Sequence, residues 1–212
     1  MKKLLAAAAL TLLGTGAFAQ TTKGTVAIGG TVSFFNEGSK RDNNSSRYRR
    51  ISLNPYVGYF IKDRTEVGAA LNLSHSQDSY YYNETENFSK AQSIGLSIYT
   101  TKYVALEEKL YLYGTVMAGA GFGGIKRKGE EYPSEVKTHN TNYFNTKLTP
   151  GFLYTVTPKL GAFISYSAIY YLNSKEKPVN SVEGAFYSSS ETFGADISLN
   201  SLQFGLNYFI VR

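Results

Sequence analysis

The sequence predicts an all-β fold, an eight-stranded antiparallel up-and-down β-barrel that crosses a membrane. Three observations predict it: an apolar N-terminal run typical of exported proteins, connections that alternate between long and short, and a last strand that alternates strictly. A period of two marks a strand with one apolar and one polar face. Short turns at one end and long connections at the other are typical of bacterial transmembrane barrels.

The N-terminal segment has the three parts of a secretory signal peptide. Two lysines precede an apolar run over residues 4–13, and small residues at Ala17 and Ala19 match a cleavage site. The run is too short to cross a bilayer as a helix. We therefore expect residues 1–19 to be a cleavable signal peptide and residues 20–212 to form one outer-membrane β-barrel domain.

The composition excludes several classes of function. The chain has no cysteine, so it has neither disulfides nor thiolate metal sites. Its net charge of +6 is spread in mixed segments, unlike the clustered basic face of a nucleic-acid binder. We therefore expect no nucleic-acid partner and no cofactor.

Eight strands are expected in the exported part of the chain. They are predicted at residues 23–35, 50–61, 66–74, 91–103, 110–122, 143–156, 160–172 and from about 192 to 210. Apolar residues alternate with small or polar ones in these strands, although the glycines and alanines of 110–122 make its two faces harder to tell apart. The long segments between them are rich in charged and polar residues and are predicted to be loops: 36–49, 75–90, 123–142 and 173–192.

Two irregularities are expected within the strands. Pro55 and Pro150 lie inside predicted strands, and proline removes a donor from the hydrogen-bond ladder, so each needs a bulge or an unpaired position. A slip in the alternation between Leu199 and Leu202 predicts a bulge near the start of the last strand.

The last strand carries a spaced pattern of its own, polar-x-Gly-x-x-aromatic-x-apolar. Gln203, Gly205, Tyr208 and Ile210 fill it. This spacing resembles the terminal signal read by the machinery that inserts outer-membrane barrels, and the resemblance implies that this machinery is a partner during insertion. Taken alone, the strand would equally suit the end of a soluble β-sandwich. A soluble eight-stranded lipocalin barrel, however, would be apolar inside rather than outside.

A second resemblance lies in the segment Ser-Leu-Asn-Pro-Tyr-Val-Gly-Tyr-Phe at residues 52–60. It resembles the second strand of small outer-membrane β-barrel-domain proteins of the OmpA, OmpX and OmpW kind, common in Bacteroidetes-type bacteria. The resemblance implies an architecture more than a function. It leads us to expect a monomer in the cell outer membrane, in contact with outer-membrane lipids and lipopolysaccharide.

The inward face of the predicted barrel is polar, with Glu66 and Lys147 as the possible lumen charges. The other inward residues expected are Asn54, Tyr56, Asn72, Tyr99, Thr149, Ser165, Gln203 and Asn207. Eight strands enclose only enough room for their own side chains. We therefore expect a largely filled lumen and a structural or surface-interaction role. The alternative is a narrow channel or transporter for small or hydrophobic solutes.

An enzyme is the third hypothesis, and it has little support. His75 stands near Ser76, Asp78 and Ser79, a grouping that superficially resembles lipid A-modifying enzymes of the outer membrane, but the spacing does not match their motifs. The two histidines, His75 and His139, are too few and too far apart for a metal site. We expect no enzyme activity and no catalytic, cofactor-binding or metal-binding residues.

Two groups of residues are expected at the membrane boundaries. Arginines in the first long connection could pair with lipopolysaccharide phosphates, or they could simply keep a loop solvated. Aromatic residues near the strand ends are expected in the two interfacial girdles: Phe34, Tyr59, Tyr99, Tyr154, Tyr170 and Tyr208.

Overall fold

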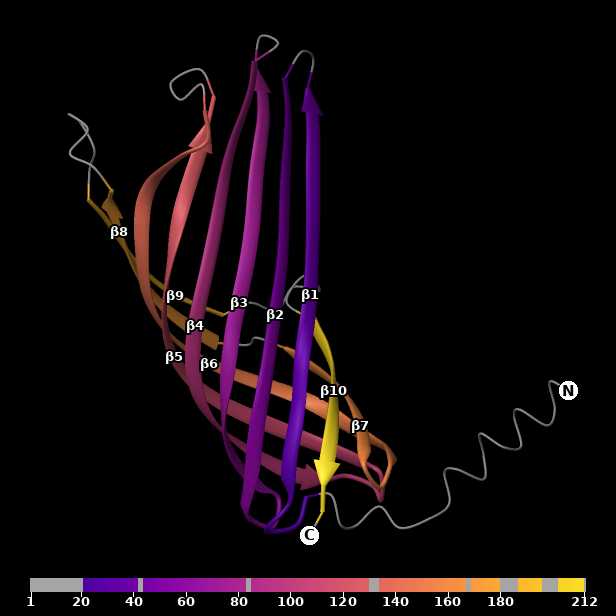
Figure 1. The fold of residues 1–212 in the computed structure, drawn as a ribbon. Coiled ribbons are helices and arrows are strands. Elements are labelled where there is room, and N and C mark those ends of the chain that lie inside the picture. The colour runs from indigo at the N-terminus through magenta and orange to yellow at the C-terminus, as the bar shows by residue number, and fades with distance from the viewer. Residues whose placement is uncertain are drawn as a thin grey trace, which may run out of the picture.

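The computed structural model describes residues 21–41, 44–82, 85–129, 134–166, 169–179, 187–195 and 202–211. Its strands are β1 (Val26–Arg41), β2 (Asn44–Lys62), β3 (Thr65–Tyr82), β4 (Thr85–Ala105), β5 (Leu110–Lys128), β6 (Val136–Thr157), β7 (Leu160–Tyr166), β8 (Ile169–Pro178), β9 (Ser188–Ala195) and β10 (Leu202–Ile210). They form a single antiparallel sheet (Figure 1). The predicted all-β class is confirmed.

The sheet closes on itself through eight strands. The ring runs from β1 to β7 in chain order and returns through β10, which pairs with both β7 and β1. β8 continues the line of β7 along β6, and β9 pairs with β8. The predicted seventh and eighth strands are therefore each present in two pieces, and the predicted eight-stranded barrel is confirmed.

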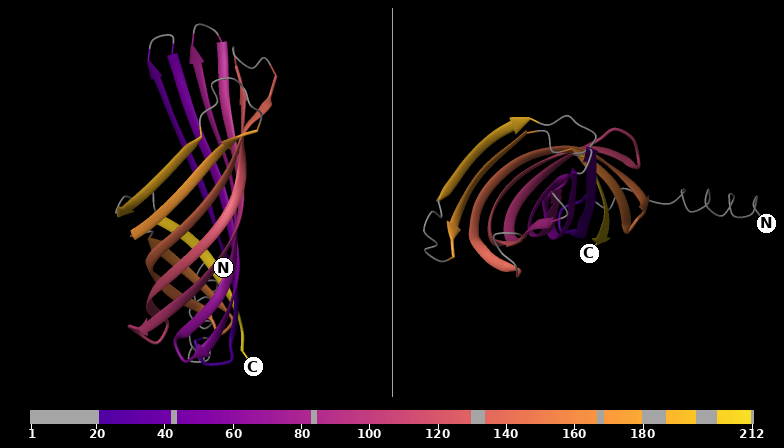
Figure 2. Two further views of the ribbon diagram at one scale, coloured as in Figure 1. Left: turned by 90° about the vertical axis from the view of Figure 1, so that its left-hand side faces the viewer. Right: turned by 90° about the horizontal axis from the view of Figure 1, so that it is seen from above.

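The wall is complete in its lower part, where β10 pairs with β1 from Val26–Ile210 to Val32–Phe204. Above Val32, β1 pairs with β2 alone among the described residues. The views in Figure 2 show the hairpins of β1 to β6 rising above the barrel, while β8 and β9 leave the wall at a lower level.

The prediction of long loops over 36–49, 75–90, 123–142 and 173–192 is wrong in its boundaries, because the strands continue far into these segments. β1 and β2 stay paired up to Arg41 and Asn44. Outside a membrane both faces of a hairpin meet water, so polar residues suit both faces while the backbone ladder continues. The predicted bulge between Leu199 and Leu202 lies outside the described residues.

Each of the two prolines interrupts the ladder with one neighbouring strand, as predicted, and keeps its pairing with the other neighbour. Pro55 pairs with Gly30 of β1, whereas the pairs between β2 and β3 skip it and keep one register on either side. Pro150 pairs with Gly114 of β5. On its other side the pairs stop at Gly151 and resume at Leu148. An unpaired position in one register accommodates Pro55. At Pro150 the register also shifts, because three steps from Leu148 to Gly151 correspond to four steps from Ser165 to Ile169.

Side chains alternate between a lipid-facing band and the lumen. The outward residues of the lower wall are apolar and exposed, among them Ile28, Val57 and Leu96. No helix among the described residues is long and apolar enough to span a membrane. The exposed apolar band of the strands is suited to contact with acyl chains.

Four of the six residues expected in the aromatic girdles lie on the outer face, as the girdle prediction requires. Phe34, Tyr59, Tyr154 and Tyr208 are exposed on the outer face. Tyr99 is buried in the lumen instead. Tyr170, the residue after the exposed Ile169, also points inward, with its ring beside Gly194. The prediction is wrong for these two because their positions alternate to the inner face.

Candidate functional site

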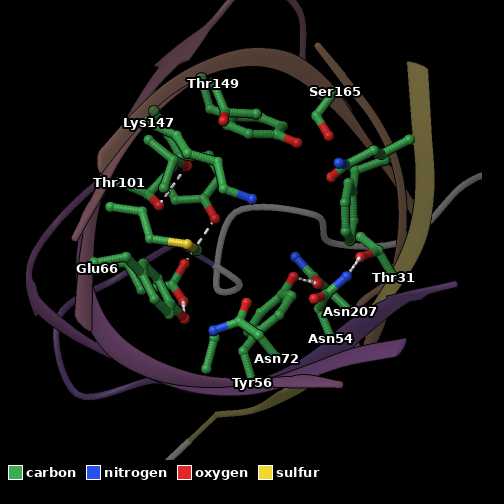
Figure 3. A pocket seen from close by; sticks show the side chains of 18 residues that line it. Thr31, Asn54, Tyr56, Glu66, Asn72, Thr101, Lys147, Thr149, Ser165 and Asn207 are labelled. Carbon is green, nitrogen blue, oxygen red and sulfur yellow. Dashed lines mark hydrogen bonds between the residues drawn. The ribbon is translucent and has the colours of Figure 1, made fainter. Parts of the chain in front are cut away.

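The candidate site is the barrel lumen, which holds a small polar cavity of about 100 Å³ (Figure 3). Every residue expected on the inner face lines it: Asn54, Tyr56, Glu66, Asn72, Tyr99, Lys147, Thr149, Ser165, Gln203 and Asn207. These side chains come from β2, β3, β4, β6, β7 and β10. Alternation along strands of known register brings them together.

Glu66 is the centre of the polar network at the bottom of this cavity. Its side chain is 1% exposed, and it receives hydrogen bonds of 2.6 Å from the hydroxyls of Tyr99 and Tyr103. Each hydroxyl donates to a different carboxylate oxygen. A carboxylate at this depth requires such donors because an unpaired buried charge is strongly unfavourable.

An apolar cluster lies at the end of the lumen with the short turns. Phe60 stacks on Tyr103 with ring centroids 5.6 Å apart and contacts Phe209 at 6.4 Å. Phe60, Phe209 and Leu153 are all fully buried. These buried rings pack together between Glu66 and the short turns.

Amide and hydroxyl pairs line the wall above the apolar cluster. Tyr56 donates to the side-chain oxygen of Asn207, linking β2 to β10 over Gly29 of β1. Asn72 donates to Ser97 at 2.7 Å. These bonds satisfy inward polar groups and hold the wall in one register.

Lys147 is the second lumen charge, and it is not paired with Glu66. Figure 3 shows its amine pointing into the middle of the cavity. In the described part of the chain, the ion pairs are those of Glu135 with Lys90 and Lys126. The two possible lumen charges therefore lie in one cavity without forming a salt bridge.

A larger hollow of about 930 Å³, the vestibule, lies beyond the polar cavity. The two spaces share Asn54, Asn72, Lys147 and Gln203 as lining residues. The vestibule is also lined by inward residues of the tall hairpins, such as Ser52. The lumen is therefore wide towards the long connections and packed with buried rings towards the short turns.

The four residues of the terminal pattern lie on β10, which closes the barrel. Tyr208 and Ile210 face outward, 47% and 43% exposed, and pair with Ile28 and Val26 of β1. Gly205 lies against the ring of Phe163, where a side chain would collide. Gln203 faces the vestibule. Two of the four thus face lipid, and the other two pack the inside.

The grouping around His75 is divided between the two faces of β3. His75 contacts Gln92 at 3.3 Å on the outer face, since both belong to the row that contains Ile51. Ser76 lines the vestibule, and Asp78 has the same inward parity. His75 and Asp78 therefore cannot act on one substrate atom.

The apolar cluster is the part of the site that was not predicted. Phe60 and Phe209 occupy inward positions of strands whose other inward residues are small or polar. The available indication was their place at strand ends beside the short turns, on the inward parity. In the sequence, Phe60 and Phe209 are exceptions to the polar pattern of the inner face. In the structure, they form the buried cluster at the end with the short turns.

Comparisons with known proteins agree with this architecture. A family model of the outer membrane protein beta-barrel domain matches residues 5–209. Among solved structures, OprG from Pseudomonas aeruginosa is 11% identical, with a TM-score of 0.55 over 92% of this chain and 100% of that chain. The translocator domain of the autotransporter NalP from Neisseria meningitidis is 12% identical, with a TM-score of 0.48 over 98% and 94%. No curated protein matches the chain.

The closed ring, the outward apolar band and the polar inner face define a small transmembrane β-barrel. The chain belongs to the outer membrane protein beta-barrel domain family. The family places it in the outer membrane. The assignment to a Bacteroidetes-type bacterium stays a prediction.

Proposed function

We propose that the chain is a non-conducting outer-membrane barrel with a structural or surface-interaction role. The observation that carries this proposal is the packed end of the lumen. Glu66 with its two tyrosines and the buried rings of Phe60 and Phe209 below it support a barrel that does not conduct. The vestibule and the tall hairpins then form the part that meets the outside.

Planar-bilayer conductance tests this proposal. The purified full chain should show no stable open level, because the buried rings would block the lumen. The variant Phe60→Ala/Phe209→Ala removes two buried rings and should produce discrete conductance steps. Phe34→Ala/Phe204→Ala removes two rings from the outer face and should stay closed. A stable open level in the unmodified chain would contradict the proposal.

A second candidate function is the uptake of small or hydrophobic solutes. One observation favours it: the lining of the vestibule includes the outward-facing Val32, Phe34 and Phe204, beside a stretch of β1 whose partner among the described residues is β2. An apolar solute could then leave the vestibule sideways into lipid without crossing the apolar cluster. Uptake of a labelled alkane by cells with and without the chain tests this route.

We further propose that the chain has no enzymatic activity of its own. The separation of His75 and Asp78 onto opposite faces of β3 supports this proposal. Lipid A from a strain that lacks the gene should have the same mass as lipid A from the parent strain. A mass difference that the intact gene restores would contradict it.

We also propose that residues 1–19 are removed during export and that the mature chain begins at Gln20. The basic start, the apolar run and the small residues before Gln20 support this proposal. The intact mass of the protein purified from outer membranes should correspond to residues 20–212. A mass that includes the first 19 residues would contradict it.

A further inference from the structure

The outer face of the tall hairpins carries a row of basic and amide side chains in register. Arg49 of β2 pairs with Asn36 of β1 and Gln77 of β3. Gln77 pairs with Lys90 of β4, which pairs with Lys126 of β5. Because directly paired residues project from the same face of a sheet, these five side chains form one row across five strands.

This row lies immediately above the apolar band. Phe34 and Ile51, which pair with each other, stand two residues below Asn36 and Arg49, and Phe34 is 72% exposed on the outer face. Two residues of strand correspond to about 7 Å. Asn36 and Arg49 therefore stand at the level of lipid head groups when Phe34 and Ile51 lie in the bilayer.

Part of this row is neutralised by the protein itself. Glu135 contacts Lys90 at 2.8 Å and Lys126 at 3.3 Å. The hydrogen bond from Lys90 holds the pKa of Glu135 below its usual value. Arg47 and Arg49 have no such carboxylate partner among the described residues.

The unneutralised cations line a groove on β1, β2 and β3, which we call the arginine groove. Its volume is about 550 Å³, and it is lined by Gly38, Ser39, Lys40, Ser45, Ser46, Arg47, Arg49, Gln77, Ser79 and Tyr81. The lining holds three cations, five hydroxyl groups and no carboxylate. Gly38 pairs directly with Arg47 and has no side chain, which leaves room beside the guanidinium.

We propose that the arginine groove binds a phosphate group of lipopolysaccharide in the outer leaflet. Guanidinium groups bind phosphate through paired, charge-assisted hydrogen bonds, and the surrounding hydroxyls add donors. The apolar residues directly below the groove would contact the acyl chains of the same molecule. A phosphorylated glycolipid supplies both parts, whereas free phosphate supplies only the first.

This inference deepens the proposed surface role and rests on the outward orientation of the tall hairpins. It does not depend on a blocked lumen, so a conducting barrel would leave it intact. The conductance experiment therefore tests only the proposed non-conducting role, and the lipid-binding experiment tests only the arginine groove.

Binding of diphosphoryl lipid A to the full chain in detergent micelles tests the inference. The unmodified chain should bind it at least tenfold more tightly than the same lipid after enzymatic dephosphorylation. Arg47→Gln/Arg49→Gln should weaken binding by roughly tenfold or more, as expected for the loss of two charge-assisted contacts. Equal amounts of inorganic phosphate should not displace the lipid.

A charge-matched control is available on the inner face. Arg50 lines the vestibule, and Arg127 has the inward parity of Ile125, so Arg50→Gln/Arg127→Gln removes the same charge from the other side of the wall. Heat-modifiable mobility on gels shows that each variant is folded. Unchanged binding in Arg47→Gln/Arg49→Gln, an equal loss in the control, or displacement by inorganic phosphate would each overturn the assignment.

Discussion

The hydroxyl of Tyr99 donates a hydrogen bond of 2.6 Å to one carboxylate oxygen of Glu66 at the base of the lumen. Tyr103 donates to the other oxygen at the same distance. The carboxylate thus joins β3 to two inward-facing side chains of β4. Removing it should leave two buried hydroxyls without an acceptor.

We therefore expect Glu66→Ala to destabilise the barrel by about 1–3 kcal/mol for each hydroxyl that loses its partner. Glu66→Gln should cost less, because its amide oxygen still accepts one of the two bonds. Urea unfolding of the barrel in lipid vesicles measures both. Equal stability of Glu66→Ala and the unmodified chain would show that the network contributes nothing.

A second prediction concerns the room that glycine leaves for this network. A methyl group at position 58 would collide with the Glu66 carboxylate and lie 2.5 Å from the Tyr99 hydroxyl oxygen. Gly58→Ala should therefore lower the free energy of unfolding by about 1–3 kcal/mol. Gly114→Ala is the matched control, since nothing lies within 4 Å of its added carbon. Similar losses in the two variants would contradict the packing argument.

The inner face of the barrel could be predicted because alternation decides which face each residue occupies. Asn54 and Tyr56, for example, follow directly from the apolar Leu53 and Val57 on either side. The extent of the strands could not be predicted in this way. Around Arg47 and Ser79 both faces meet water, so the alternation ends although the ladder continues.

Contacts between side chains of different strands could not be predicted from the sequence either. Glu66 and Tyr103 are far apart in the chain, and Tyr99 was expected both in the lumen and in a girdle. Only the register of β3 against β4 shows which tyrosines reach the carboxylate. The contact between Phe60 and Phe209 depends in the same way on the closure of β10 against β1.

The third prediction concerns the terminal strand. Tyr208 and Ile210 face lipid beside β1, so replacing both with Asn removes apolar burial of about 1–3 kcal/mol per side chain. If they also form the insertion signal, assembly should fail and unfolded precursor should accumulate in the periplasm. Leu71→Asn/Leu73→Asn is the control on the outer face of β3. Equal assembly of the two double variants in cells would show that the terminal strand carries no special insertion signal.

The fourth prediction concerns Glu135, which lies above the apolar band. Its pKa is lowered from the ordinary value of 4.5, chiefly by the hydrogen bond from Lys90 and less by Lys126. Its contribution to stability is therefore present above its unfolded-state pKa and is lost as the pH falls through the lower folded-state pKa. An NMR titration of the carboxyl group should show a larger upward pKa change in Lys90→Gln than in Lys126→Gln. The opposite order would contradict the assignment.

The orientation of the barrel, with the vestibule at the cell surface and the short turns in the periplasm, is the central claim, and thiol labelling tests it most directly. The chain has no cysteine, so one introduced thiol reports one position. Ser52 lines the vestibule, and Lys159 is exposed in the short turn between β6 and β7. A bulky, membrane-impermeant maleimide added to intact cells should label Ser52→Cys, and should label Lys159→Cys only after the outer membrane is permeabilised. Labelling of Lys159→Cys in intact cells, with Ser52→Cys protected, would contradict the account.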